Sequence, residues 1–119
     1  MGVDDTVVRT ARAAAQRLAV DLGDQLPGDV EAALHALDGA PMAERYVDPI
    51  SLAGLVVSVA TFAWTVYRDL QNETASPARE IVERRVRVQV RETDASAPPR
   101  QQDRIIEVVV AEVMRSREP

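Results

Sequence analysis

The chain has 119 residues, enough for one domain, and it contains no cysteine, so disulfides and all thiolate-based sites are excluded. Its 14 basic residues are all arginine, and 19 acidic residues give a net charge of -5. This acidic balance makes nucleic-acid binding a poor prediction, because that function needs clustered positive charge.

Residues 1–48 form an acidic segment, with four arginines against nine carboxylates. A capping aspartate near the start and apolar residues at helical spacing predict a first helix that ends at about Leu22, where Gly23 is a natural stop. A short second helix is expected from Asp29 to Gly39. The two helices predict a hairpin whose joined apolar stripes need another surface to cover them.

His35 is the single histidine, and Glu31 and Asp38 lie near it on the second predicted helix. A metal site needs three or four ligands and a second shell, and no further histidine or cysteine is present. The spacing therefore predicts an exposed helix face with ordinary side-chain pairs, without a metal.

Residues 49–70 predict one long apolar helix, because a capping Asp48 is followed by Pro49 and 18 residues from position 50 to 67 carry no charge. As a helix these 18 residues rise about 27 Å, at the short end of what a bilayer core requires. Aromatic residues stand where membrane-interface anchors belong; they are Tyr46 at one edge, and Trp64 and Tyr67 at the other.

One face of the apolar helix carries only small or hydroxyl side chains, namely Ser51, Gly54, Ser58, Thr61 and Thr65. In a membrane this stripe would let two helices approach closely, which predicts self-association. In a soluble bundle it would lie beneath a crossing helix while the bulky face fills the core. The hydroxyls can bond to carbonyls one turn earlier, and a run of five uncharged turns favours the membrane-spanning interpretation over the buried one.

Residues 71–119 are rich in arginine and glutamate. Ser76-Pro77 is a start signal for a fourth helix, although residues 85–91 alternate strictly between polar residues and valine. A short strand around 86–91 is therefore the alternative, and a helix is favoured because a lone strand has no visible partner. After a loop, residues from Asp103 onward predict a last helix.

Positive charge is concentrated in the fourth element, at Arg79, Arg84, Arg85, Arg87 and Arg91. These side chains are candidates for contacts with anionic lipid headgroups or with an acidic partner. The alternative is a solvated helix face that is balanced by Glu80, Glu83 and Glu92.

The sequence contains no catalytic constellation and no phosphate-binding glycine loop. It therefore predicts no catalytic residues, no cofactor and no small-molecule substrate. The expected fold is all-α with about five helices. The leading hypothesis is a non-enzymatic, single-pass membrane protein that associates with an unknown protein and with copies of itself through its helices. Arginines are more numerous after the apolar helix, which places the C-terminal segment in the cytoplasm. The alternative is a soluble, cytoplasmic helical adaptor or regulatory domain that buries residues 49–70 in its core and recruits a larger partner protein.

Overall fold

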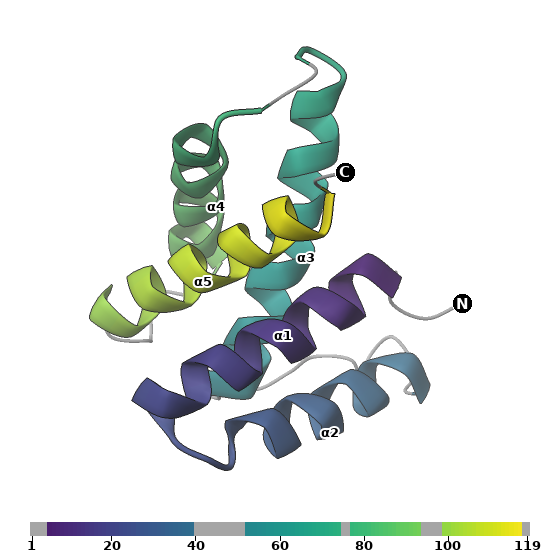
Figure 1. Ribbon diagram of the computed structural model, residues 1–119, viewed down its shortest axis with the longest axis vertical. Helices are drawn as coiled ribbons and strands as arrows, with labels where there is room; N and C mark the ends of the chain where they lie inside the picture. The colour runs from purple at the N-terminus through teal and green to yellow at the C-terminus, as the bar shows by residue number, and fades with distance from the viewer. Residues whose placement is uncertain (1–4, 40–51, 75–76, 94–98, 118–119) are drawn as a thin grey trace.

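The protein is a bundle of helices in the computed structural model, which describes residues 5–39, 52–74, 77–93 and 99–117. The helices are α1 (Asp5–Leu22), α2 (Leu26–Gly39), α3 (Leu52–Gln71), α4 (Arg79–Thr93) and α5 (Pro99–Arg117) (Figure 1). No strand occurs within these ranges. The prediction of an all-α fold with about five helices is confirmed.

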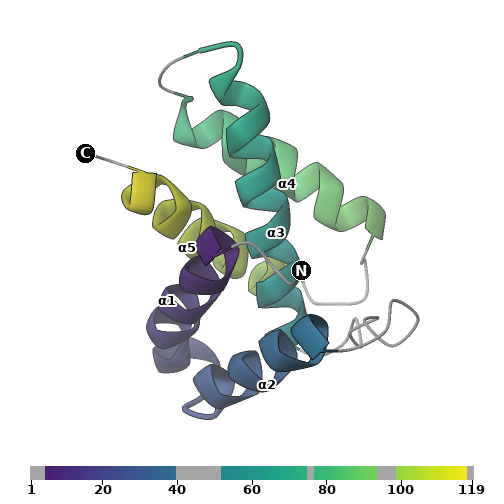
Figure 2. The same ribbon diagram turned by 90° about the vertical axis from the view of Figure 1, so that its right-hand side faces the viewer.

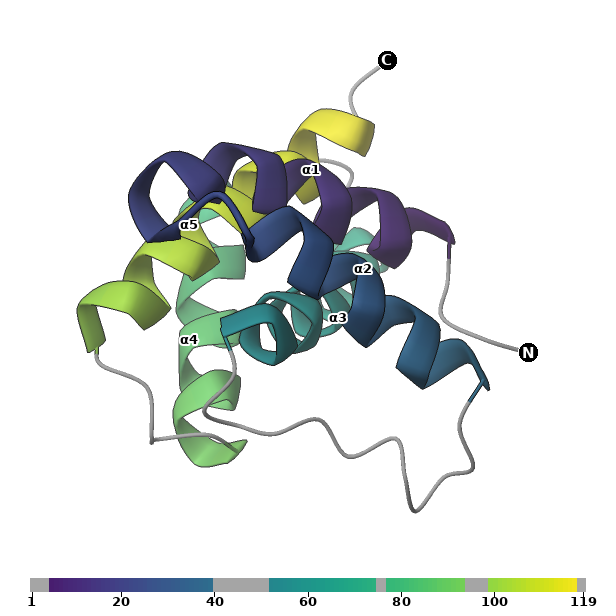
Figure 3. The same cartoon turned by 90° about the horizontal axis from the view of Figure 1, so that it is seen from below.

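α3 is the central helix, because it packs against all four of the others. Figure 3, which looks nearly along the axis of α3, shows α1, α2, α4 and α5 arranged around it. Its first turns are enclosed on every side, since the five consecutive residues 53–57 are all buried. A helix that is apolar all round fits such an enclosed position, which accounts for the uncharged run in the sequence.

The membrane-spanning interpretation of the apolar helix is wrong. Across residues 5–39, 52–74, 77–93 and 99–117, no helix combines the length and the apolar character that crossing a bilayer requires. Val56 and Val59, which belong to the bulky face opposite the stripe of small residues, are fully buried in the core that the helices of this chain form. The orientation inferred from the arginine count falls with that interpretation. The predicted start of the helix at position 49 lies outside the described residues.

Gly23 ends α1 as predicted, but the first residue of α2 differs from the prediction. Gly23 adopts φ +119°, a conformation that favours glycine, and its N–H donates to the carbonyl of Ala19 at 3.0 Å. α2 then begins at Leu26, earlier than the predicted Asp29. Pro27 does not prevent this, because the N–H groups of a first helical turn have no partner within the helix in any case.

α4 is helical from Arg79 to Thr93, so the short strand around 86–91 is wrong. Val82, Val86 and Val90 recur every four residues and are fully buried or nearly so. This spacing brings one valine per turn against α3 and α5, the two helices that α4 contacts. α5 likewise begins at Pro99, four residues before the predicted Asp103.

Arginine–carboxylate pairs link the helices around the apolar core. Arg12 on α1 pairs with Glu31 on α2. Two pairs, Arg17–Glu112 at 2.8 Å and Arg104–Asp21 at 2.9 Å, join α1 to α5. A further pair, Arg87–Asp103 at 2.9 Å, joins α4 to α5.

Candidate functional site

α4 has one face in the core and one face in solvent. It lies at the edge of the bundle and contacts α3 and α5, whereas α1 and α2 do not touch it (Figures 2 and 3). Val82, Val86 and Val90 fix its inner face in the core. The opposite face therefore has no neighbour among the described residues.

We define the α4 outer face by five exposed side chains, which are Ile81, Arg84, Arg85, Val88 and Arg91; Glu80, Gln89 and Glu92 are exposed beside them on the same helix. Their spacing of three and four residues places them along one side of the helix. Ile81 is 43% exposed and Val88 is 54% exposed. In the described part of the chain these are two of the three large hydrophobic side chains that are exposed; the third is Val20 on α1.

The five arginines that the sequence groups together do not share one role. Arg87 pairs with Asp103 of α5 at 2.9 Å, through Nε and Oδ1. Arg79 lies 3.4 Å from Glu83 and donates from Nη2 to the carbonyl of Glu107 on α5 at 3.5 Å. Arg79 and Arg87 therefore hold α4 against α5.

The other three arginines, Arg84, Arg85 and Arg91, form no hydrogen bond or ion pair with the described residues. Glu83, which the sequence suggested as a balancing charge, is engaged by Arg79. Two adjacent arginines thus stand between Ile81 and Val88 with no carboxylate bound to them. Their guanidinium groups remain available to an external ligand.

The predicted stripe of small residues on α3 does not have a single environment. Gly54 is buried, Ser58 is half-buried, and Thr61 and Thr65 are exposed, while Ser51 lies outside the described residues. The Thr61 hydroxyl donates to the carbonyl of Val57 at 3.0 Å, the bond to the preceding turn that the sequence suggested. Self-association through the stripe remains a prediction, and the residues available for it are the exposed ones.

Two of the three predicted membrane anchors pack together on α3. Tyr67 is buried, and its ring stacks on that of Trp64 with centroids 6.4 Å apart and an interplanar angle of 11°. The guanidinium of Arg68 lies 5.8 Å from the Trp64 ring, within cation–π range. Tyr46 lies outside the described residues. The anchor role depended on a membrane-spanning helix and falls with it.

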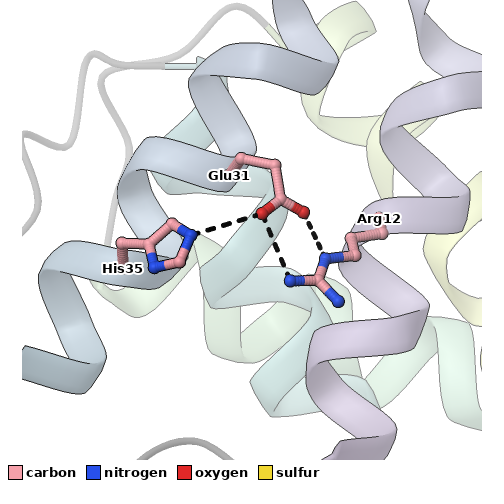
Figure 4. A network of polar contacts seen from close by, with 3 residues as sticks. All are labelled: Arg12, Glu31 and His35. Atoms are coloured by element: carbon pink, nitrogen blue, oxygen red, sulfur yellow. Dashed lines mark hydrogen bonds and ion pairs between the residues drawn. The ribbon is translucent and has the colours of Figure 1, made fainter.

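Glu31 is held by Arg12 rather than placed in a cluster of metal ligands. Figure 4 shows the Glu31 carboxylate between the Arg12 guanidinium and the His35 ring. Arg12 binds it through Nε and, at 3.2 Å, through Nη2, while His35 Nε2 lies 3.7 Å from Oε2. The hydrogen bond from Arg12 lowers the pKa of the Glu31 carboxyl below its ordinary value. Within the described ranges, no three potential His, Asp or Glu ligands gather into a metal-binding group.

Ile81 and Val88 are the residues that the sequence analysis missed. Val88 belongs to the alternating pattern of residues 85–91, and neither residue was among the candidates for contact with a partner. The missing signal was helical phase: three valines four residues apart define the inner side, which leaves Ile81 and Val88 pointing away from it.

Comparisons of the sequence with protein-family models and with curated proteins, and a search of solved structures, found no significant match.

Proposed function

We propose that this chain is a non-enzymatic helical adaptor domain that recruits a protein partner through the α4 outer face. One observation carries the proposal: the α4 outer face combines two exposed aliphatic side chains with three arginines that bind no described residue and that outnumber the two exposed glutamates beside them. The inner face of the same helix is buried in the core, so the α4 outer face is held facing away from it. α3 is buried in that core, which supports a helical adaptor domain rather than a membrane-anchored protein.

The composition of the α4 outer face suits a protein contact. Protein interfaces combine apolar centres with polar rims, and arginine is enriched among the residues that contribute most to binding. Ile81 and Val88 supply apolar area, and Arg84 and Arg85 lie between them. The exposed groups here are binding groups on a convex helix, which supports recruitment rather than catalysis.

Site-specific photo-crosslinking tests this proposal in the cells that make the protein. A photoreactive amino acid would replace Val88 in the full chain, and the adducts would be identified by mass spectrometry. We expect a defined protein adduct that disappears when Arg84 and Arg85 are both changed to glutamate. These substitutions lie on the surface, so unchanged circular dichroism would show that the fold is retained.

Val20 provides a matched control, because it is an exposed valine on α1, a helix that does not contact α4. We expect that the same photoreactive residue at position 20 does not form the adduct that is obtained from position 88. The proposal fails if position 88 yields no protein adduct, or if positions 20 and 88 yield the same adducts.

A further inference from the structure

We infer that the partner segment recognised by the α4 outer face is an acidic amphipathic helix. The inference rests on the proposed function, because it names the partner of the same surface. It follows from the spacing of the aliphatic residues and from the charge between them.

The spacing favours a helical partner. Ile81 and Val88 are seven residues apart, so they lie on one line of α4, about 10 Å from each other along its axis. A helix with apolar residues at intervals of three and four presents side chains at the same period when it lies along α4. An extended strand would need a sheet edge to bind, and the described residues contain no strand.

The charge favours an acidic partner. Arg84, Arg85 and Arg91 border the aliphatic residues, as charged residues border the apolar seam between paired helices, and they outnumber the two exposed glutamates of the same helix, Glu80 and Glu92. Carboxylates are the natural ligands of unpaired guanidinium groups, which bind them through two hydrogen bonds. The whole chain carries a charge of -5, whereas α4 carries five arginines against three glutamates, so the net charge of this helix attracts an acidic partner.

The same charges disfavour a second copy of α4 as the occupant. A two-fold contact between two α4 helices would place Arg84 and Arg85 of each copy near the symmetry axis. Four guanidinium groups would then face one another near the axis, while Glu80 and Glu92 of each copy lie toward the two ends of the helix. A partner that brings carboxylates to the centre of the face avoids this repulsion.

The probe for this inference is a synthetic 21-residue helical peptide. It carries leucine at heptad spacing along one face and glutamate at the positions that border the leucines. Fluorescence anisotropy measures its binding to the full chain, next to that of a peptide in which glutamine replaces each glutamate. We expect the glutamate peptide to bind at least about tenfold more tightly, with an affinity that falls as salt is raised.

Variants of the protein locate the site. The double change Arg84→Glu and Arg85→Glu should weaken binding of the glutamate peptide at least about tenfold. The change Ile81→Ser with Val88→Ser should weaken it while the dependence on salt persists. The matched control is Arg9→Glu with Arg100→Glu, which alters the net charge equally through two exposed arginines on α1 and α5 and should leave the affinity unchanged.

Several results would overturn the inference. Equal binding of the two peptides, no binding of either, or an equal loss in the control variant would each do so. Retention of the chain on phosphatidylserine vesicles, dependent on Arg84 and Arg85 and without peptide binding, would identify anionic lipid as the ligand instead. A protein adduct at position 88 without peptide binding would remove this inference and leave the proposed function standing. Peptide binding without any cellular adduct would contradict the proposed recruitment of a protein partner. The inferred preference of the α4 outer face for an acidic helix would then stand.

Discussion

Arg17 on α1 donates from Nη1 to Oε2 of Glu112 on α5 at 2.8 Å, and so joins two helices through residues that are 95 positions apart in the chain. The Glu112 side chain is only 10% exposed, whereas that of Arg17 is 48% exposed. The carboxylate has therefore lost most of its water and depends on the guanidinium, while the guanidinium would be solvated without its partner.

We expect Arg17→Met to lower the free energy of unfolding by about 1–3 kcal/mol, because the enclosed Glu112 carboxylate would be left without a cation. Methionine keeps much of the apolar stem of arginine, so the loss of packing stays small. Urea denaturation followed by circular dichroism measures the change. Adding Glu112→Gln to the variant should recover part of the loss, since no buried charge then remains.

Arg104→Met is the control for this pair, because Arg104 binds Asp21 at 2.9 Å between the same two helices. Both of those side chains are close to half exposed, so this loss should stay below about 1 kcal/mol. Equal losses in Arg17→Met and Arg104→Met would show that burial of the carboxylate has no part in the effect.

Because Glu31 is bound by Arg12, we expect the stability of the protein to depend on pH. The pKa of Glu31 is lowered in the folded chain by the hydrogen bond from Arg12, so Glu31 contributes stability fully above its unfolded pKa of about 4.5. That contribution is lost as the pH falls through the lower, folded pKa. We expect Arg12→Gln to raise the pKa of Glu31 toward its ordinary value and to reduce stability at neutral pH more than below pH 4.

An NMR titration of the Glu31 side-chain carboxyl measures this pKa directly. Arg9→Gln serves as the control, because Arg9 is exposed on the same helix and no described residue forms an ion pair with it. A Glu31 pKa that stays the same in Arg12→Gln would contradict the assigned cause.

Two glycines predict effects of opposite sign. At Gly23 the backbone has φ +119°, which alanine rarely adopts, so Gly23→Ala should destabilise the protein by about 1–3 kcal/mol. Gly28 lies within α2, where an added Cβ meets no atom within 4 Å. Gly28→Ala should therefore stabilise it, by up to about 1 kcal/mol, through helix propensity and a less flexible unfolded chain. Thermal unfolding of both variants tests the pair, and a shift in the same direction would contradict the backbone argument.

The sequence predicted the number and type of the helices because local periodicity and helix-end residues decide these features. For example, α1 ends at Leu22 because Gly23, the next residue, adopts a positive φ that stops the helix. It did not decide what surrounds α3. The run from 50 to 67 satisfies a bilayer and a helical core alike, and the choice depends on four other helices whose apolar faces close around it.

The sequence predicted which residues form the arginine cluster of the candidate site, but not which contacts each arginine makes. The sequence located the arginine cluster, but nothing local distinguishes Arg87 from Arg85. Arg87 pairs with Asp103 because α5 crosses α4 on that side, 16 residues later in the chain. Which charges remain available is thus a property of helix packing, and periodicity in one segment does not contain it.

The α3 stripe predicts a graded response to larger side chains. Gly54 is buried, so Gly54→Leu should destabilise the protein by about 1–3 kcal/mol or more through overpacking. Thr65 is exposed at the other end of the stripe, and Thr65→Leu should change stability by no more than about 0.5 kcal/mol. Chemical denaturation measures both, and sedimentation of Thr65→Leu checks its oligomeric state. Equal destabilisation would mean that the whole stripe is covered.

Val86 and Val88 separate the helical from the extended conformation of α4. In a strand, Val86, Val88 and Val90 would share one face, and truncating any of them would cost a similar amount. In the helix Val86 is fully buried and Val88 is 54% exposed. We expect Val86→Ala to lower the free energy of unfolding by about 1–3 kcal/mol through lost burial and a residual cavity. Val88→Ala should stay within about 0.5 kcal/mol of the parent, since alanine also favours the helix. Urea unfolding distinguishes the two patterns, and similar losses at positions 86 and 88 would overturn the helical phase on which the α4 outer face depends.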